Sequence, residues 1–497
     1  MTLAPLRALL PAIALFGAPL RGQDATRDSV RVRLAPDSLV SFDGRRSDAL
    51  RTTLTLPQGR AGVADTLSVD VGYLRLTARV ATGRAPIVFL MGGPGVPASV
   101  IGRIPPYWTL FQRLRDSADV ILLDQRGVGL SRPALDCPAG PSPPPDFLAS
   151  LETLTAALRA AFAPCVTHWR GRGIPAEVIS VDEVAADIED IRRHLGVARV
   201  SLLGFSYGTR IALQYVKRFP DHVDRVALQG TLGFADGVRL PVTLDSLLDR
   251  LRAAAARDSV ARGLVPDLRR ALVERFAALE RQPLDVPVAR VGGDTVRITV
   301  GRGGLQALLT GRLADPRLPA LVASLAAGDT RVLGVMVAGI YGDLAAGGGS
   351  LFGRAVYCSA PGPEDREQEA RRQGRAALLG EVFDNVPTSP EFCRAIGITP
   401  GPRASPPTRV LDRPALFVSG TLDDRTPPGN AERAARYFAT AHVVTVQNGG
   451  HELLPVGVVQ ELIARFLWAG RVDSTRLTLP PPRFVTVAEA LQAPARR

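Results

Sequence analysis

The sequence predicts an α/β fold in which a mostly parallel sheet is interrupted by a large helical cap, and two observations support this prediction. Before residue 233 and after residue 407, short apolar runs alternate with segments of helical periodicity, as in sheets whose strands are buried on both faces. Between these positions the alternation stops and helical periodicity dominates. We therefore expect a core of residues 23–232 and 408–497, with a cap of residues 233–407 inserted between its two parts.

The first part of the predicted core begins with strands that alternate apolar and polar residues. Residues 24–84 have this period of two, which is typical of antiparallel strands at a sheet edge. Two continuous apolar runs follow, Pro86–Met91 and Val120–Leu123, and each should form a strand buried on both faces. Residues 106–114 should form a short helix between them, and the proline-rich residues 133–145 an irregular loop.

A helix and two further strands complete this part of the core. Ser180 to Glu183 match a capping box, and the apolar positions after it repeat at helical spacing until Gly196. The apolar run that begins at Val200 should be a strand, followed by a helix through Tyr215 and a strand at Arg225–Leu228.

The cap and the end of the core follow from the same patterns. Helical periodicity in the cap covers residues 244–256, 268–279, 305–313 and 318–327. Strand and helix then alternate again over residues 414–420, 431–439, 442–446 and 456–468. The tail from Arg471, which contains three consecutive prolines, should be extended.

Composition argues against a nucleic-acid partner. The 60 basic and 48 acidic residues leave a formal charge of +12 (60 − 48). All of the basic residues except Lys217 are arginines, and they are scattered among acids without clusters of aromatic side chains. The chain is rich in Arg, Ala, Gly and Pro. This bias is more typical of the base composition of a genome than of a protein that binds nucleic acid.

The first 22 residues are expected to be a signal peptide. Arg7 precedes an apolar run, Ala8–Leu20, that is too short to span a bilayer, and Pro11 and Pro19 argue against a buried helix. No later stretch has about 18 uncharged apolar residues. We therefore expect export to the periplasm or the cell exterior without stable membrane insertion. The sequence does not predict an oligomeric state.

Four cysteines fit an oxidising compartment and two disulfides. Three pairings are possible, and short loops favour Cys137–Cys165 with Cys358–Cys393. No Cys-x-x-Cys spacing and no histidine cluster indicates a metal site, so we expect neither a metal nor a cofactor.

A Gly-x-Ser-x-Gly motif, Gly204 to Gly208, is the strongest sign of chemistry. In a nucleophile elbow, a tight turn between strand and helix pushes the serine hydroxyl out above the sheet edge. A Cβ at either glycine would collide with the neighbouring strand or helix. Such a motif also occurs by chance in surface turns, but the strand before it and the helix after it favour a catalytic Ser206.

An acid and a base follow later strands in the order that this elbow requires. An α/β-hydrolase triad runs serine, acid, histidine, and here Asp423 and His451 each follow a late predicted strand. We predict that His451 takes the proton of Ser206 and that Asp423 orients the imidazole. Asp424 is the alternative acid. The remaining histidines are expected to be structural or at the surface: His168, His194, His222 and His442.

Two backbone amides are expected to form the oxyanion hole. One is that of Tyr207, and the other comes from the Gly92–Gly95 turn, where Gly93 is favoured over Gly95. Asp124 and Arg126 fit a role in holding their turn together better than a role in chemistry.

Several short motifs together resemble the prolyl iminopeptidase and tripeptidyl aminopeptidase group of serine peptidases, which are α/β-hydrolases. They are Gly92-Gly93-Pro94-Gly95, Asp124–Ser131, Gly204–Gly208, Leu422-Asp423 with Thr426-Pro427, and Gly450-His451. The resemblance covers residues 68–470, and the long insertion, paired cysteines and signal resemble the secreted tripeptidyl aminopeptidase branch. It implies release of residues or short peptides from a free N-terminus, with the substrate ammonium held by carboxylates on the cap.

The chain differs from this group at three places. Met91 stands where histidine is common, Gln229 replaces a common aspartate, and Ser359-Ala360 follow Cys358 where an acid is common. Four acids further along the chain could supply a substitute for this acid: Glu364, Asp365, Glu367 and Glu369. A solvated run of charges is the simpler interpretation of these four residues.

These observations predict an exported serine hydrolase, an aminopeptidase that cleaves peptides with a free N-terminus through an acyl-enzyme. The alternative is a carboxylesterase that acts on small or lipid esters with the same triad. A non-catalytic binding protein is disfavoured, because all three triad residues are present.

Overall fold

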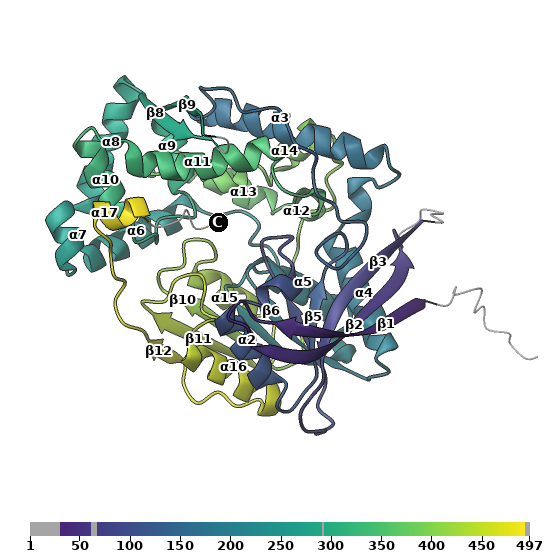
Figure 1. The fold of residues 1–497 in the computed structure, drawn as a ribbon. Helices are drawn as coiled ribbons and strands as arrows, with labels where there is room; N and C mark the ends of the chain where they lie inside the picture. The colour runs from purple at the N-terminus through teal and green to yellow at the C-terminus, as the bar shows by residue number, and fades with distance from the viewer. Residues whose placement is uncertain (1–29, 61–66, 291–292, 493–497) are drawn as a thin grey trace, which may run out of the picture.

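The computed structural model describes residues 30–60, 67–290 and 293–492 (Figure 1). The predicted signal peptide therefore lies outside the described residues. The strands are β1 (Arg31–Val40), β2 (Arg46–Pro57), β3 (Ser68–Leu76), β4 (Ile87–Leu90), β5 (Val120–Asp124), β6 (Val200–Phe205), β7 (Val223–Gln229), β8 (Leu284–Ala289), β9 (Thr295–Val300), β10 (Ala415–Gly420), β11 (Ala441–Gln447) and β12 (Arg476–Thr478).

The following helices lie before residue 233 or after residue 407, outside the predicted cap. They are α1 (Ala98–Ile101), α2 (Pro105–Leu114), α3 (Leu151–Arg170), α4 (Val181–His194), α5 (Tyr207–Arg218), α15 (Pro428–Ala435), α16 (Gly457–Ala469) and α17 (Val487–Gln492). The helices of the predicted cap are α6 (Pro241–Ala255), α7 (Ser259–Leu264), α8 (Leu268–Arg281), α9 (Arg302–Leu309), α10 (Leu318–Ala326), α11 (Arg331–Ala345), α12 (Leu351–Cys358), α13 (Glu364–Gly374) and α14 (Pro390–Ala395).

One ten-stranded sheet forms the core, in the order β1-β2-β3-β5-β4-β6-β7-β10-β11-β12. The first three strands pair in antiparallel fashion, and β3 is antiparallel to β5. Every pairing from β5 to β12 is parallel. The predicted α/β-hydrolase fold, with antiparallel edge strands and a mostly parallel sheet, is confirmed.

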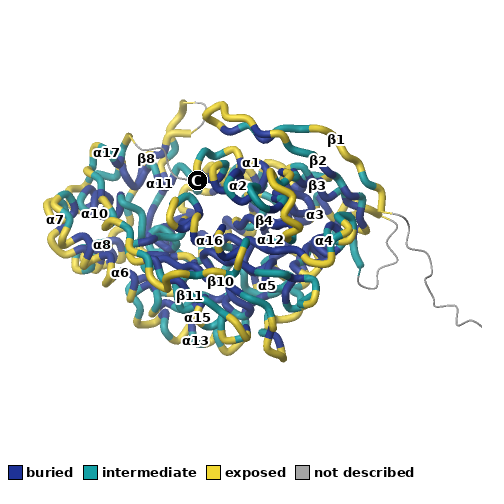
Figure 2. Tube along the Cα trace, turned by 90° about the horizontal axis from the view of Figure 1, so that it is seen from below, coloured by how far each residue is buried: buried dark blue, intermediate teal, exposed yellow. Residues whose placement is uncertain are grey.

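Both faces of the sheet are buried, as the continuous apolar runs predict. In β4, Val88 and Leu90 pack in one apolar cluster, which includes α4 and α5, while Ile87 and Phe89 pack in another, which includes α2 and α16. Figure 2 shows the buried residues concentrated along the central strands and the exposed ones along β1 and α7. The two layers hold the strand ends in fixed positions, and the candidate site lies on those ends.

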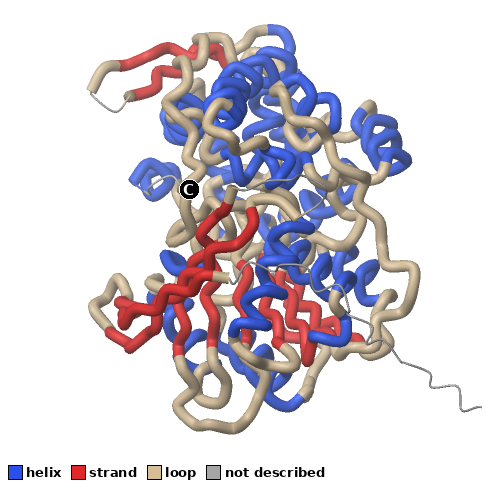
Figure 3. Tube along the Cα trace, turned by 90° about the vertical axis from the view of Figure 1, so that its right-hand side faces the viewer, coloured by secondary structure: helices blue, strands red, loops and turns tan. Residues whose placement is uncertain are grey.

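The cap contains a β-hairpin that the sequence analysis missed. Strands β8 and β9 pair with each other in antiparallel fashion, and Figure 3 shows them at the top of the molecule among the helices, apart from the large sheet. Pro287 lies within β8, and a proline normally argues against a strand. A two-stranded sheet consists of edges alone, and an edge strand tolerates a proline.

Helix α3 is a second element that the sequence analysis missed. It starts at a complete capping box, in which Ser150 and Thr153 each bond the other's backbone. It packs against α9, α11, α12 and α14, so it joins the upper layer of Figure 1 although it precedes residue 233. The division of the chain at residues 232 and 407 stays a proposal, and α3 packs within the layer of cap helices.

The sequence analysis expected an extended C-terminal tail, but the tail also contains a strand and a helix. Strand β12 adds to the parallel edge of the sheet beside β11, and α17 packs against α10 and α11 (Figure 1). The tail therefore connects the core to the cap.

Only one of the two hydrogen bonds of the predicted capping box at Ser180 forms. The Ser180 hydroxyl accepts a hydrogen bond from the Glu183 amide at 3.0 Å. The Glu183 carboxylate instead pairs with Arg60 at 2.6 Å and with the buried Arg126 at 3.2 Å. Arg126 also bonds Asp187 at 2.6 Å. Its role is structural, as predicted, because it ties the turn after β5 to α4.

Over the described residues, no single helix is long and apolar enough to cross a membrane. Helices α10 and α11 would reach the required length only as a pair bent by 119°.

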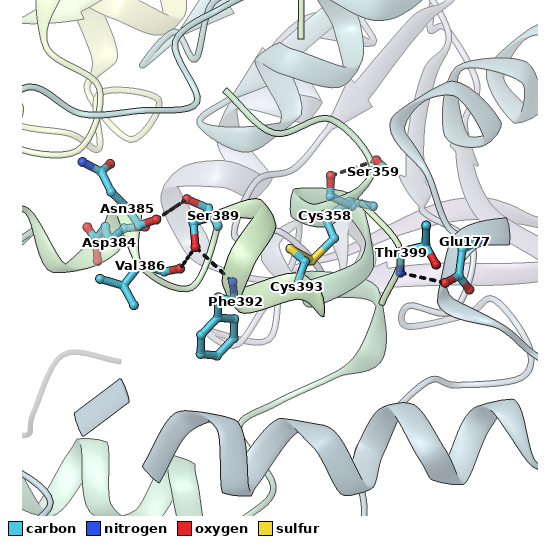
Figure 4. The surroundings of a disulfide bond; sticks show 12 residues. Glu177, Cys358, Ser359, Asp384, Asn385, Val386, Ser389, Phe392, Cys393 and Thr399 are labelled. Carbon is cyan, nitrogen blue, oxygen red and sulfur yellow. Dashed lines mark hydrogen bonds between the residues drawn. A yellow bond between two sulfur atoms is a disulfide. The ribbon is translucent and has the colours of Figure 1, made fainter. Parts of the chain in front are cut away.

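Two disulfides form in the pairing that the short loops favoured. Cys137–Cys165 ties the proline-rich loop to α3, and Cys358–Cys393 joins α12 to α14 (Figure 4). The Cys358–Cys393 bridge spans 35 residues of the cap.

Replacing Cys358 and Cys393 together with alanine should lower the free energy of unfolding by about 2–4 kcal/mol, because the unfolded cap regains the freedom of the closed loop. Urea unfolding of both proteins would measure this loss. In the presence of a reductant the difference between the two proteins should shrink, and an unchanged difference there would contradict the explanation.

Candidate active site

The turn after β6 places Ser206 in a strained backbone. Its φ of 53° and ψ of −124° lie in a region that residues other than glycine rarely adopt. A Cβ on Gly204 would lie 2.9 Å from the Cα of Thr209, and one on Gly208 would overlap the carbonyl oxygen of Leu90. The predicted need for both glycines is therefore confirmed, because the helix start and β4 leave no room for a side chain.

Three predicted side chains meet at the carboxyl ends of three strands. The Ser206 Oγ lies 2.9 Å from His451 Nε2, and His451 Nδ1 lies 2.9 and 3.0 Å from the two carboxylate oxygens of Asp423. Ser206 follows β6, Asp423 follows β10 and His451 follows β11. The geometry is that of a nucleophile, a base and an acid that orients the base.

The alternative acid, Asp424, does not take part in this chain of hydrogen bonds. Its carboxylate accepts a hydrogen bond from the Ala314 amide at 3.3 Å, on the cap side. Burial, followed by the charge of Asp423, raises the pKa of Asp424. The two adjacent carboxyl groups therefore lie in opposite electrostatic environments.

Asp423 is enclosed but well supplied with donors. Burial alone would raise its pKa, but the charge of His451 and hydrogen bonds from His451 and Thr426 outweigh it, so the pKa is lowered. The amides of Arg425 and Thr426 donate to Oδ1 at 2.8 Å each, and the Thr426 hydroxyl donates to Oδ2 at 2.7 Å. Asp423 can thus stay ionised and stabilise a protonated imidazole.

Gln229 supports the site, and the sequence analysis treated it only as a departure from the related group. It is fully buried at the end of β7. Its side chain donates to the carbonyl of His451 at 2.9 Å and accepts from the Leu453 amide at 3.2 Å, while its carbonyl accepts from the Ser206 amide at 3.0 Å. A polar residue directly after the apolar run Val226–Leu228 at the end of β7 was the available signal.

Replacing Gln229 with leucine should leave two backbone groups of the His451 loop unpaired, the partly buried His451 carbonyl and the buried Leu453 amide. We expect the free energy of unfolding to fall by about 2 kcal/mol or more, and kcat to fall about tenfold as the imidazole loses its fixed position. Urea unfolding and steady-state kinetics would measure both. Gln214→Leu is the matched control, because Gln214 bonds only an exposed Asp182. An equal loss in both variants would contradict the supporting role.

The predicted oxyanion donors lie around the same space. Gly93 and Tyr207 line one cavity together with Ser206. The neighbouring Gly92 packs so closely that a Cβ there would lie 2.7 Å from the Cβ of Ser206. Gly95 faces the cap instead, where a Cβ would lie 3.3 Å from Phe352. This placement favours Gly93 over Gly95.

The cavity that contains Ser206 has a volume of about 670 Å³. Much of its wall is apolar and comes from Met91, Val96, Ile101, Ile104 and Phe205. Glu452, next to His451, provides a carboxylate, and the described ion pairs and hydrogen bonds give it no partner. Over the described residues, no three His, Cys, Asp or Glu side chains are grouped so that they could hold a metal ion.

The four acids named above as substitutes for the cap carboxylate are not among the described residues that line this cavity. All four lie on α13. Glu367 pairs with Arg403 at 3.0 Å and Glu369 with Arg372 at 2.5 Å. The simpler interpretation of a solvated charge run fits the exposed Glu364 and Asp365, whereas Glu367 is largely buried beside Arg403.

The remaining candidates are structural. The Asp124 carboxylate accepts hydrogen bonds from the Ser99 hydroxyl at 2.6 Å and from the Leu130 amide at 2.8 Å, so it holds the turn after β5 against α1. His222 contacts Glu189 at 3.0 Å, away from Ser206.

Comparison with known proteins places the chain in a family. Residues 85–458 match the alpha/beta hydrolase fold family. YuaR of Escherichia coli (strain K12) is 28% identical over 405 residues, 77% of each chain. The serine protease Hip1 of Mycobacterium tuberculosis is 32% identical over 176 residues, 33% of each chain. The proline iminopeptidase of Neisseria meningitidis serogroup B is 28% identical over 145 residues, 29% of this chain and 32% of its own. These relatives confirm the predicted resemblance and support a hydrolase.

Proposed function

Because this chain belongs to the alpha/beta hydrolase fold family, we propose that it is a serine peptidase of the aminopeptidase type, which releases residues or short peptides from a free N-terminus. The hydrogen-bonded chain from Ser206 through His451 to Asp423, on the wall of a 670 Å³ cavity, carries this proposal. Relatives named serine protease and proline iminopeptidase support the peptidase class.

The proposed reaction proceeds through an acyl-enzyme. Nε2 of His451 takes the proton of Ser206 as Oγ attacks the substrate carbonyl carbon, and the amides of Gly93 and Tyr207 stabilise the oxyanion. The intermediate collapses, the C–N bond breaks, and His451 passes its proton to the leaving amine. Water, deprotonated by His451, then attacks the ester, and the proton returns to Ser206 as the acid product leaves.

Glu452 is the proposed partner of the substrate ammonium. Its carboxylate lines the cavity beside His451, while the cap position expected from the related group holds Ala360. An exposed carboxylate without a partner among the described residues, on the wall of this cavity, favours a cation there. The ammonium site would then lie on the core and not on the cap.

Export completes the proposal. The apolar segment within residues 1–22 and two disulfides in the described chain support a location in the periplasm or outside the cell. The substrates would then be peptides of that compartment.

Hydrolysis of an Ala-Ala-Pro arylamide, with its N-terminus either free or acetylated, tests the aminopeptidase assignment. We expect cleavage of the free form alone, and Glu452→Gln should raise KM for it. Ser206→Ala is the blank. Equal cleavage of both forms, or turnover only of short-chain p-nitrophenyl esters, would transfer the function to the alternative, a carboxylesterase with the same three residues.

A further inference from the structure

A second cavity, of about 300 Å³, adjoins the one that contains Ser206. The two cavities share five lining residues, Gly93, Leu232, Arg239, Tyr357 and Arg425. A substrate whose carbonyl lies at Ser206 could therefore extend into this second space, which reaches under the cap helix α12.

Guanidinium groups dominate the second cavity. Arg312, Arg354 and Arg425 line it, and the ion pairs of the described residues include none of the three. The two acids of the wall are already neutralised: Asp384 pairs with Arg239, and Asp236 pairs with Arg433 at 2.7 Å. The cavity therefore carries an excess of positive charge.

Two of these arginines are partly buried, and neither forms an ion pair among the described residues. The guanidinium carbon of Arg354 lies 4.5 Å from the ring centre of Phe162, and burial lowers the pKa of Arg354. Burial, and then the charge of Arg425, lowers the pKa of Arg312. Partly buried cations that repel one another are costly, and an anion among the three groups would reduce that cost.

We propose that this cavity is an anion subsite, in which Arg312, Arg354 and Arg425 hold a carboxylate of the substrate while its scissile carbonyl lies at Ser206. Guanidinium forks match the two oxygens of a carboxylate and bind it in bidentate geometry. The carboxylate is either an acidic side chain or the free C-terminus of a short peptide. The inference rests on the proposed function only in that cleavage occurs at Ser206.

Binding is tested first without catalysis, by calorimetric titration of the Ser206→Ala protein with glutarate and with its uncharged diamide. We expect glutarate to bind at least about tenfold more tightly than the diamide. Arg354→Gln and Arg425→Gln should each remove most of this difference. The Arg425 side chain is exposed, so its variant tests the proposal even if Arg354→Gln does not fold.

The matched control is Arg302→Gln, which removes an exposed cap arginine paired with Glu280. It should leave glutarate binding unchanged. Equal binding of glutarate and the diamide, or an equal loss in the control, would overturn the anion subsite.

Activity then distinguishes the sources of the carboxylate. Arylamide substrates with Glu or Gln at each position test the side chain, and short peptides with a free or amidated C-terminus test the terminus. In one of these two comparisons, we expect the charged substrate to be cleaved about tenfold or more faster than the uncharged one. Arg425→Gln should abolish this preference. No preference in either arm, while neutral substrates are cleaved, would overturn the subsite. The protein could bind glutarate through these arginines and yet cleave no peptide. That result would support the subsite and overturn the proposed peptidase function.

Discussion

Ser206→Ala is expected to lower kcat/KM for the cleaved arylamide by about 10⁴- to 10⁶-fold. The variant keeps the cavity, the oxyanion amides and the ion pair of His451 with Asp423, but it loses the only atom that bonds to the substrate carbon. The alanine Cβ replaces that of serine at the same backbone angles, so the elbow itself should persist. The predicted effect is therefore chemical and leaves stability nearly unchanged.

Steady-state kinetics and covalent labelling by a fluorophosphonate would measure the effect together. The wild-type protein should be labelled at Ser206 and the variant should not. Ser246→Ala is the control, because Ser246 lies exposed on α6, where it bonds only the Val242 carbonyl. Labelling that persists in Ser206→Ala would assign the nucleophile to another residue.

Ser206, Asp423 and His451 could be predicted because each is marked by a local pattern. A tight turn needs glycines beside the serine, and the acid and the base each follow one of the last two predicted strands. Chain order then supplies the long-range information, since parallel strands place all of their carboxyl ends at one edge. Local patterns and topology together were sufficient to predict that Ser206 and Asp423 each lie within hydrogen-bond distance of His451.

The supporting residues could not be predicted in this way. Gln229 acts through backbone groups of a loop more than 200 residues later, and no spacing in the sequence encodes that contact. Arg312, Arg354 and Arg425 come from three separate segments and meet only because the cap packs over the core. Among many scattered arginines, nothing in the sequence distinguishes these three. Helix α3 and the hairpin β8–β9 were missed for a similar reason, since their partners in the cap determine their positions.

Asp423→Asn is expected to lower kcat by about 10⁴-fold without unfolding the protein. The amides of Arg425 and Thr426 both donate to Oδ1, so the amide oxygen of an asparagine would take that position. Its NH₂ group would then face His451 Nδ1, in place of Oδ2. A donor at that position favours the tautomer with the proton on Nε2, and this tautomer cannot accept the proton of Ser206.

Asp424→Asn is the matched control for this substitution, because it changes the next residue in the same way. Asp424 already has a raised pKa in its buried position, and an asparagine oxygen can still accept the Ala314 amide. We expect kcat to stay within about tenfold of the wild-type value, a change of about 1.4 kcal/mol at most in the activation barrier. Steady-state kinetics with one arylamide substrate would compare the two variants directly. A loss in Asp424→Asn as large as that in Asp423→Asn would mean that both carboxyl groups control the imidazole, and the assignment of a single acid would then be wrong.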